Sequence, residues 1–253
     1  MHQFVSLNSR ICGTADARVS AISAAALYGR GIFTTVALAE GKPLLWASHW
    51  TRLQDHGARI GLEITAFNKE KAADALDELI HVNGVGNGVA RLTFFDESSG
   101  GLWPFHTAPG TSLLIMTRDP RPAPDGMRLT VSPYQINSTS PLAGVKSSNY
   151  LENLLALEEA KSRGFDEAVR LNERGEVTSA CIANIFWEKD GQIFTPSLRT
   201  GCLAGTTRGE LVARGAVEVT AEIDAIVNAD SLMLTSAGLG RLYATEFKMP
   251  PQP

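Results

Sequence analysis

Residues 173–186 read ERGEVTSACIANIF, a turn-forming stretch that leads into residues typical of buried strands. A hairpin turn at Asp190-Gly191 follows, then Phe194-Thr195-Pro196, and then LAGTTR at residues 203–208. A glycine followed by hydroxyl residues ahead of an apolar pattern is typical of a helix N-terminus. The N–H groups and dipole there favour an anion such as phosphate, although an ordinary threonine cap has the same pattern. This order predicts strands joined by tight turns and then a helix start suited to an anion.

A lysine stands upstream of this stretch, in residues 144–151, which read GVKSSNYL. Lys146 ends a turn-rich segment and precedes leucines at helical spacing, with Gly164 as a stop signal. Such a lysine projects from the end of an element rather than along a solvated face. An amine held beside a packed element can lose its proton and form a Schiff base with a carbonyl. Most lysines are simply solvated, so this position alone makes Lys146 a candidate catalytic residue that the neighbouring motifs must support.

Together these motifs resemble the class IV (fold type IV) pyridoxal-phosphate enzymes, which are the branched-chain and D-amino-acid aminotransferases and 4-amino-4-deoxychorismate lyase. The resemblance runs from Gly29 to about Ala237. It rests on four motifs in order: a lysine before a helix, V-T-x-x-x-x-x-N-I-F, T-P and G-x-T-R. It implies a two-domain α/β fold with a smaller N-terminal α/β domain and a larger, strand-rich C-terminal α/β domain. It also implies pyridoxal 5′-phosphate as cofactor and a homodimer whose subunits complete each other's pockets.

The resemblance also implies which residues bind the cofactor. Lys146 matches the lysine that binds the cofactor aldehyde. Arg52 matches the phosphate arginine, whose guanidinium can hold two phosphate oxygens in a fork. Thr207 matches the phosphate-binding threonine, with the backbone of Thr206 beside it. Ser236 fits the last phosphate loop, although the next residue is alanine where the aminotransferases often have threonine.

The position at the cofactor's pyridine nitrogen departs from the family pattern. Relatives usually read V-T-E there, whereas this chain reads Val177-Thr178-Ser179. A carboxylate at that nitrogen favours the charged pyridinium, but the hydroxyl of Ser179 supplies no compensating charge, so the ring should be mostly neutral. Glu176 is expected to point to the opposite face of the strand, because the offset between the two residues is odd. A neutral ring is a weaker electron sink, which favours elimination over transamination and also leaves open an enzyme of reduced activity.

The substrate is less well determined by the sequence. Phe33-Thr34-Thr35 resembles the lyases, since aminotransferases commonly have a glutamate near Thr34, and Thr34 is a candidate substrate-binding residue. Asn149-Tyr150-Leu151 resembles both groups, and Tyr150 either reaches the cofactor's phenolic oxygen or packs. Arg91 lies near the expected substrate region, but its strand position does not decide which way it faces.

Three functions therefore stay open. The leading one is 4-amino-4-deoxychorismate lyase, which releases pyruvate and leaves 4-aminobenzoate for folate biosynthesis. The alternatives are a class IV aminotransferase acting on D- or branched-chain amino acids, and a non-catalytic or weakly active scaffold that binds the cofactor.

Composition limits the class of protein. The chain has 253 residues, 44% of them hydrophobic and 20% charged, with a net charge of −4. These values are typical of an ordinary soluble globular protein and give no general reason to expect nucleic acid or anionic membrane as a partner. No run approaches the roughly 20 apolar residues of a membrane span. Cys12, Cys181 and Cys202 lack metal-ligand spacing, and no secretory leader is visible, so we expect reduced thiols, a cytoplasmic location and no metal. The expected partner is a small amino-acid-like substrate.

Periodicity divides the chain into an N-terminal domain (1–117), a linker (118–126) and a C-terminal cofactor-binding domain (127–253). Prolines at alternate positions stiffen the linker and stop helix and sheet. In the N-terminal domain we expect a helix capped by Ser48 and closed by Gly61, and a second helix at 68–81. Strands are expected at 5–7, 31–38, 44–46, 89–95 and 112–116, with a loop at 98–110.

The C-terminal domain reads as strand-rich. We expect helices at 151–162 and 207–214 and a frayed tail at 249–253. Strands are expected at 127–131, 167–171, 185–187, 192–195, 217–220 and 232–235.

Overall fold

The computed structural model describes residues 1–99, 110–122 and 124–250. The chain forms two compact units, which are Met1–Arg121 with Val145–Asn149, and Pro122–Gly144 with Tyr150–Pro253. The segment around Lys146 thus belongs to the first unit, although it follows the linker in the sequence. Most of the expected loop at 98–110 and the last three residues of the expected frayed tail lie outside the described residues.

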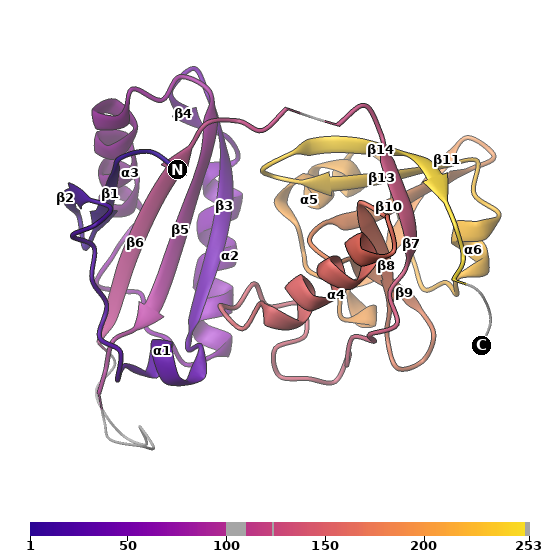
Figure 1. Cartoon of the computed structure of the whole chain (residues 1–253), viewed down its shortest axis with the longest axis horizontal. Coiled ribbons are helices and arrows are strands. Elements are labelled where there is room, and N and C mark those ends of the chain that lie inside the picture. Colours follow the sequence, from indigo (N-terminus) through magenta and orange to yellow (C-terminus); the bar gives the residue numbers. More distant parts are fainter. Residues whose placement is uncertain (100–109, 123, 251–253) are drawn as a thin grey trace. The chain divides into compact units, whose positions relative to one another are not determined.

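The first unit is built on a sheet whose described strands lie in the order β2-β1-β6-β5-β3-β4 (Figure 1). Its neighbouring strands are antiparallel. The elements of this unit are β1 (Phe4–Leu7), β2 (Arg10–Gly13), α1 (Ala24–Tyr28), β3 (Gly31–Ala39), β4 (Lys42–Pro43), α2 (Trp46–Arg59), α3 (Lys69–Asn83), β5 (Gly88–Asp96) and β6 (Thr111–Arg118).

The core of this unit lies between one face of the sheet and helices α2 and α3. Successive side chains of a strand point to opposite faces, so alternate residues of β3, β5 and β6 reach the helices. The buried strand residues on this face are Ile32, Val36, Leu38, Ala90, Leu92, Phe94, Leu113 and Ile115. The other face of β3 therefore presents Phe33 and Thr35.

The start of α2 differs from the expectation. The expected strand at 44–46 is wrong, because β4 ends at Pro43 and Leu45 adopts a left-handed backbone conformation with φ 53°. The helix then begins at Trp46, so Ser48 lies within it and does not cap it. Trp46, Trp50 and Leu53 share one helical face and pack in the core, with the two tryptophan rings 6.0 Å apart. Burial of these side chains decides the helix start.

The second unit contains a sheet with the described order β12-β11-β10-β13-β14-β7-β8-β9. Its elements are β7 (Met127–Val131), α4 (Leu151–Ser162), β8 (Glu167–Leu171), β9 (Val177–Ala180), β10 (Asn184–Lys189), β11 (Gln192–Pro196), the 3-10 helix η1 (Leu198–Thr200), α5 (Thr206–Ala213), β12 (Val217–Val219), α6 (Asp224–Val227), β13 (Ser231–Ser236) and β14 (Gly240–Phe247).

Helix α4 has the predicted bounds but buries a different face. Ala156 and Ala160 are fully buried against Ala168 and Cys181, whereas the leucines that suggested the helix are more exposed. Leu151, Leu154 and Leu155 are exposed by 66%, 45% and 48%. No helix in the described part of the chain is both long and apolar enough to cross a membrane.

Candidate active site

Lys146 is held along the edge of β3. Its carbonyl accepts a hydrogen bond from the N–H of Phe33 (2.9 Å), and the N–H of Ser148 donates to the carbonyl of Gly31 (2.8 Å). The N–H of Lys146 itself donates to Nδ1 of His56, at 3.1 Å. The backbone on both sides of the lysine is therefore fixed by the strand, and its side chain starts from a defined position.

The amine of Lys146 lies in a cationic environment. Its Nζ is 4.4 Å from the centre of the Phe33 ring, and the guanidinium of Arg91 lies 3.6 Å from the same ring centre. Arg91 pairs with Thr35 across β3 and β5, which puts it on the face of Phe33. Burial, followed by the charges of Arg52 and Arg91, lowers the pKa of Lys146 to about 7. A large fraction of the amine is therefore neutral near pH 7, as a nucleophilic lysine requires.

Arg52 is oriented by a buried hydrogen-bond chain. Its Nη2 donates to Oγ1 of Thr34 (2.7 Å), which lies 2.6 Å from Nδ1 of His49. A guanidinium only donates, so Oγ1 of Thr34 accepts from Arg52, and the hydroxyl hydrogen can be donated to Nδ1 of His49. Burial, followed by the charges of Arg52 and Lys146, lowers the pKa of His49 to about 3, so this imidazole is neutral. Thr34, which is expected to bind substrate, is fully buried, and its hydroxyl lies between Arg52 and His49.

His56 is the second neutral imidazole of this unit. It is 5% exposed, and burial, followed by the charges of Arg52, Arg59 and Lys146, lowers its pKa to about 4. Its neutral Nδ1 can therefore accept the Lys146 N–H. Sequence reasoning gave neither histidine a role. Their seven-residue spacing, which is about two helical turns and puts both on one face, was the available signal.

In the second unit, α5 begins as the G-x-T-R motif predicts. Gly205 is its N-cap, and a Cβ at this position would require the side chain of Asn184 to move. Thr206 is buried and Thr207 half-buried in the first turn. Thr235, which pairs with Asn184 across β10 and β13, has a buried Oγ1 without a hydrogen-bond partner among the described residues. The N–H groups at the start of α5 and the hydroxyl of Thr235 are groups that can donate hydrogen bonds to a phosphate.

The other expected cofactor residues also lie in the second unit. Ser179 is in β9, is 8% exposed and pairs with Arg170 of β8. Tyr150 directly precedes α4 and is half-buried. Ser236 ends β13, where its Oγ accepts a hydrogen bond from the N–H of Leu239 at 3.2 Å.

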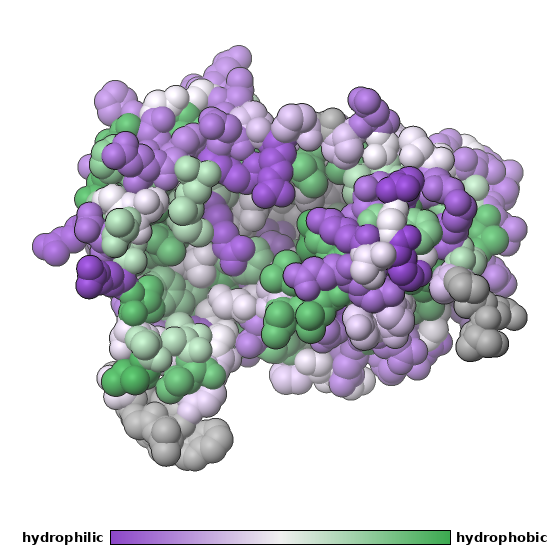
Figure 2. Space-filling view, viewed as in Figure 1, coloured by the Kyte–Doolittle hydropathy of each residue, from purple (hydrophilic) through white to green (hydrophobic). Residues whose placement is uncertain are grey.

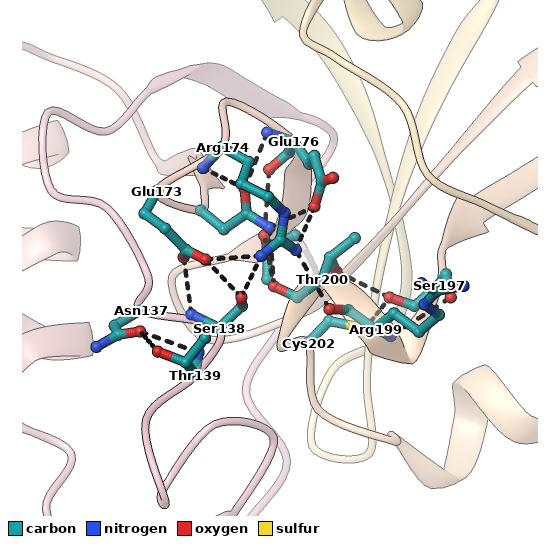
Figure 3. Close-up of polar contacts among 12 residues, drawn as sticks. Asn137, Ser138, Thr139, Glu173, Arg174, Glu176, Ser197, Arg199, Thr200 and Cys202 are labelled. Atoms are coloured by element: carbon teal, nitrogen blue, oxygen red, sulfur yellow. Dashed lines mark hydrogen bonds and ion pairs between the residues drawn. The ribbon is translucent and has the colours of Figure 1, made fainter.

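Glu176 is expected to point away from Ser179 because of strict strand alternation, but the structure gives a different reason. The register shifts between Arg170 and Leu171, so strict alternation does not hold from Glu176 to Ser179. The carboxylate of Glu176 accepts a hydrogen bond from Nη2 of Arg174 at 2.6 Å (Figure 3). It also accepts one from Nδ2 of Asn172, at 2.6 Å.

The structure thus divides the expected site residues between the two units. Thr34, Arg52 and Lys146 lie in the first unit, and Tyr150, Ser179, Thr206, Thr207 and Ser236 lie in the second. Among the described residues, no group of three or more His, Cys, Asp or Glu could hold a metal ion. Cys181 is buried, and burial raises the pKa of its thiol, so it is not a nucleophile.

Comparison with known sequences identifies the family. The sequence profile described as "Amino-transferase class IV" matches residues 31–247. The chain belongs to the class IV aminotransferase family. Aminodeoxychorismate lyase of Bacillus subtilis (strain 168) is 29% identical over 243 residues, covering 92% of this chain and 83% of the relative. A putative branched-chain-amino-acid aminotransferase of Methanocaldococcus jannaschii is 30% identical over 238 residues, covering 90% and 82%.

Solved structures agree with this class IV assignment at the level of the fold. A branched-chain aminotransferase from Thermoproteus uzoniensis with norvaline has a TM-score of 0.90 at 22% identity, covering 100% of this chain and 91% of its own. A T.th. branched-chain amino acid aminotransferase with pyridoxamine 5′-phosphate has a TM-score of 0.89 at 22% identity, covering 98% and 86%. The predicted fold class, an α/β fold of type IV, is confirmed.

Proposed function

We propose that this class IV protein is a pyridoxal-phosphate-dependent lyase that converts 4-amino-4-deoxychorismate to 4-aminobenzoate and pyruvate. The residues fit the cofactor chemically. Lys146 offers a partly neutral amine for the aldehyde, and the α5 start with the spare hydroxyl of Thr235 suits the phosphate. The bound cofactor would supply the electron sink for breaking bonds at the carbon that carries the substrate's amino group.

Charge in the first unit supports an anionic substrate. The charges that act on Lys146 are those of Arg52 and Arg91, both positive, while His49 and His56 are neutral. We assign Arg52 to the cofactor phosphate, which leaves Arg91 to bind a substrate carboxylate. Arg91 stacks on Phe33, which limits the directions its guanidinium can take. A dicarboxylate such as aminodeoxychorismate matches this excess of cations.

Lys146 also moves the protons of the reaction. Its neutral Nζ takes the proton from the substrate carbon that carries the amino group, and it returns a proton to the departing pyruvate fragment. The bond from His56 to the Lys146 backbone and the contact with Phe33 hold the amine in one region during both transfers. Neutral His49 keeps Arg52 directed by way of Thr34.

Ser179 is the observation that carries the choice of a lyase. A hydroxyl in place of the usual carboxylate leaves the ring nitrogen without a compensating negative charge. Elimination tolerates a shorter-lived carbanion than transamination, which must reprotonate the cofactor itself. The neighbouring acid, Glu176, is bound to Arg174 and Asn172, so it does not replace the missing carboxylate.

The proposed function is tested by loading the protein with pyridoxal phosphate and identifying products. We expect the visible absorbance band of a lysine-bound cofactor, and release of 4-aminobenzoate and pyruvate in equal amounts from aminodeoxychorismate. Amino transfer between D- or branched-chain amino acids and keto acids without that release would identify an aminotransferase. Failure to form the absorbance band would rule out both enzymes and favour the non-catalytic scaffold.

We also propose that the protein is a homodimer and that α4 contributes to its interface. Leu151, Leu154 and Leu155 form an exposed apolar surface on this helix, and Figure 2 shows hydrophobic side chains gathered over it. Exposed patches of this kind mark interaction surfaces. Replacing Leu154 and Leu155 with glutamate should give monomers in light scattering. The same change at Val217 and Val227, which are also exposed, should not.

A further inference from the structure

Arg170 lies directly opposite Ser179 in the second unit. The two residues are register partners in the antiparallel pair β8 and β9. Directly opposite residues point to the same face of a sheet, with Cβ atoms about 4.5–5.5 Å apart. Val169 and Ala180, the next pair, point to the opposite face and pack in the core of the unit. A ligand atom that binds to Ser179 therefore lies on the same face of the sheet as Arg170.

The guanidinium of Arg170 is buried and held in place. The residue is 1% exposed. Its Nε donates to the carbonyl of Tyr134 at 3.3 Å, and its Nη2 donates to the carbonyl of Gln135 at 3.1 Å and to the carboxylate of Glu152. Glu152 is the only acid paired with it among the described residues, and its side chain is 63% exposed. Water screens that carboxylate far more than it screens the buried arginine, so the face keeps a net positive charge.

The other acid near this strand pair does not offset Arg170. The carboxylate of Glu167 is buried, and it accepts hydrogen bonds from the N–H groups of Ala168 (3.0 Å), Cys181 (2.8 Å) and Ile182 (3.1 Å). Burial raises the pKa of Glu167. Two of these donors, Cys181 and Ile182, directly follow β9. Glu167 is an odd number of residues from Arg170 along β8 and so points to the opposite face, which leaves Arg170 as the charged residue of β8 and β9 on the face of Ser179.

We propose that Arg170 is a positioning residue that keeps the heteroaromatic nitrogen bound at Ser179 unprotonated. This inference rests on the proposed function, since it takes Ser179 as the partner of the cofactor's ring nitrogen. A cation beside a pyridine nitrogen disfavours the pyridinium, just as a carboxylate favours it. The lack of a glutamate at position 179 and the presence of Arg170 then both lower the pKa of the ring nitrogen. A glutamate at 179 would face Arg170 across the ladder and would be partly neutralised by it.

The test measures the protonation of the ring nitrogen itself. The protein is loaded with pyridoxal phosphate labelled with 15N in the ring, and the 15N chemical shift is followed against pH. We expect an unprotonated nitrogen in the native protein at neutral pH. Arg170→Leu should raise the pKa of the ring nitrogen by about one to three pH units, the range expected for one nearby charge. Ser179→Glu should raise it less than the double variant Ser179→Glu/Arg170→Leu does, because only the double variant frees the new carboxylate.

Two further variants separate charge from structure. Arg163→Leu removes a guanidinium that pairs with Glu159 and donates to the carbonyl of Val131 (3.0 Å), but that has no register partner at Ser179. It should leave the 15N titration unchanged. Glu152→Gln removes the exposed acid and keeps Arg170, and it should lower the ring pKa by less than Arg170→Leu raises it, because water already screens this carboxylate. If the Arg170–Glu152 pair had only a structural role, removing either partner would not shift the pKa of the ring nitrogen in opposite directions.

The outcomes distinguish this inference from the proposed function. A native protein that binds the cofactor with a protonated nitrogen at neutral pH would overturn the role of Arg170 while leaving the enzyme assignment intact. Equal titration midpoints in the native protein and in Arg170→Leu would do the same, and so would equal midpoints in the native protein and in the more conservative Arg170→Gln if the leucine variant does not fold. Failure of the native protein to bind the cofactor would overturn both.

Discussion

Two groups of charged residues, one in each unit, are organised in opposite ways. Around Lys146 the charges are partly buried and all positive, and the neighbouring histidines are neutral. Around Arg174 the charges are of both signs, and Arg174 and Glu173 are exposed. Arg174 contacts the carboxylates of Glu173 and Glu176 at 2.7 and 2.6 Å and the hydroxyl of Ser138 at 2.7 Å (Figure 3).

The difference separates a candidate site from a well-bonded turn. Hydrogen bonds from the backbone and hydroxyl of Ser138 lower the pKa of Glu173 to about 2, so a shifted pKa alone does not mark a functional residue. The turn around Arg174 satisfies its own charges and needs no ligand. The cluster around Lys146 places like charges close enough to lower the pKa of the lysine under partial burial, which is the kind of perturbation found at functional sites. The predictions below test this contrast.

The largest expected effect is that of Lys146→Ala. Removing the amine should abolish the visible cofactor band and all lyase or transaminase turnover, while circular dichroism remains that of the native protein. Lys189→Ala is the matched control, because Lys189 is an exposed lysine that pairs with Asp230 at 3.0 Å. Full activity in Lys146→Ala would end the assignment of this lysine as the cofactor amine.

The next prediction concerns the pH dependence of Lys146. Its pKa of about 7 makes the neutral, reactive amine dominant above pH 7. Well below pH 7, the initial rate of cofactor uptake should fall about tenfold per pH unit, because the neutral fraction falls by that factor. The formation of the visible band after rapid mixing measures this rate. A rate that keeps rising towards the ordinary lysine pKa would show that burial and the two arginines do not act on this amine.

A smaller effect is expected at His56, in the stability of the cofactor-free protein. Its pKa is about 4 in the folded state and 6.5 as the ordinary value. Between these pH values the unfolded state binds the proton and the folded state does not, so acidification destabilises the fold by about 1.4 kcal/mol per pH unit for one proton. His56→Asn removes this titration and keeps a side-chain acceptor for the Lys146 N–H.

Urea unfolding between pH 4 and 6.5 measures the slope of the unfolding free energy. We expect a shallower slope in His56→Asn and the native slope in His81→Asn, which replaces an exposed histidine of α3. Equal slopes in all three proteins would show that His56 is not held neutral by its surroundings.

The smallest effect is expected at Arg174. Its ion pairs are exposed, and exposed pairs contribute little because water and salt screen them. Arg174→Ala should leave the thermal midpoint and cofactor binding close to the native values, in contrast to every change around Lys146. A loss of cofactor binding in a folded Arg174→Ala protein would show that the turn belongs to the site.

The sequence predicted those features that depend on local pattern. The lysine before α4, the bounds of α4 and the glycine at the start of α5 follow from spacing and turn chemistry. The roles of His49 and His56 depend on which helical face meets β3 and the Lys146 segment, and that is decided by tertiary packing. The pairing of Arg170 with Ser179 depends on strand register and on the bulge before Leu171, neither of which a single sequence shows. The start of α2 differs from the expectation because packing of the partly buried Trp46 against the core overrides the local strand pattern.

The central claim is that this class IV protein eliminates pyruvate in preference to transferring an amino group. One competition experiment tests it most directly. The loaded protein is given aminodeoxychorismate together with branched-chain and D-amino acids and 2-oxoglutarate, and 4-aminobenzoate, pyruvate and glutamate are quantified from the same tube. We expect 4-aminobenzoate and pyruvate in equal amounts and in large excess over glutamate. Glutamate formation in excess, with aminodeoxychorismate unconsumed, would contradict the claim.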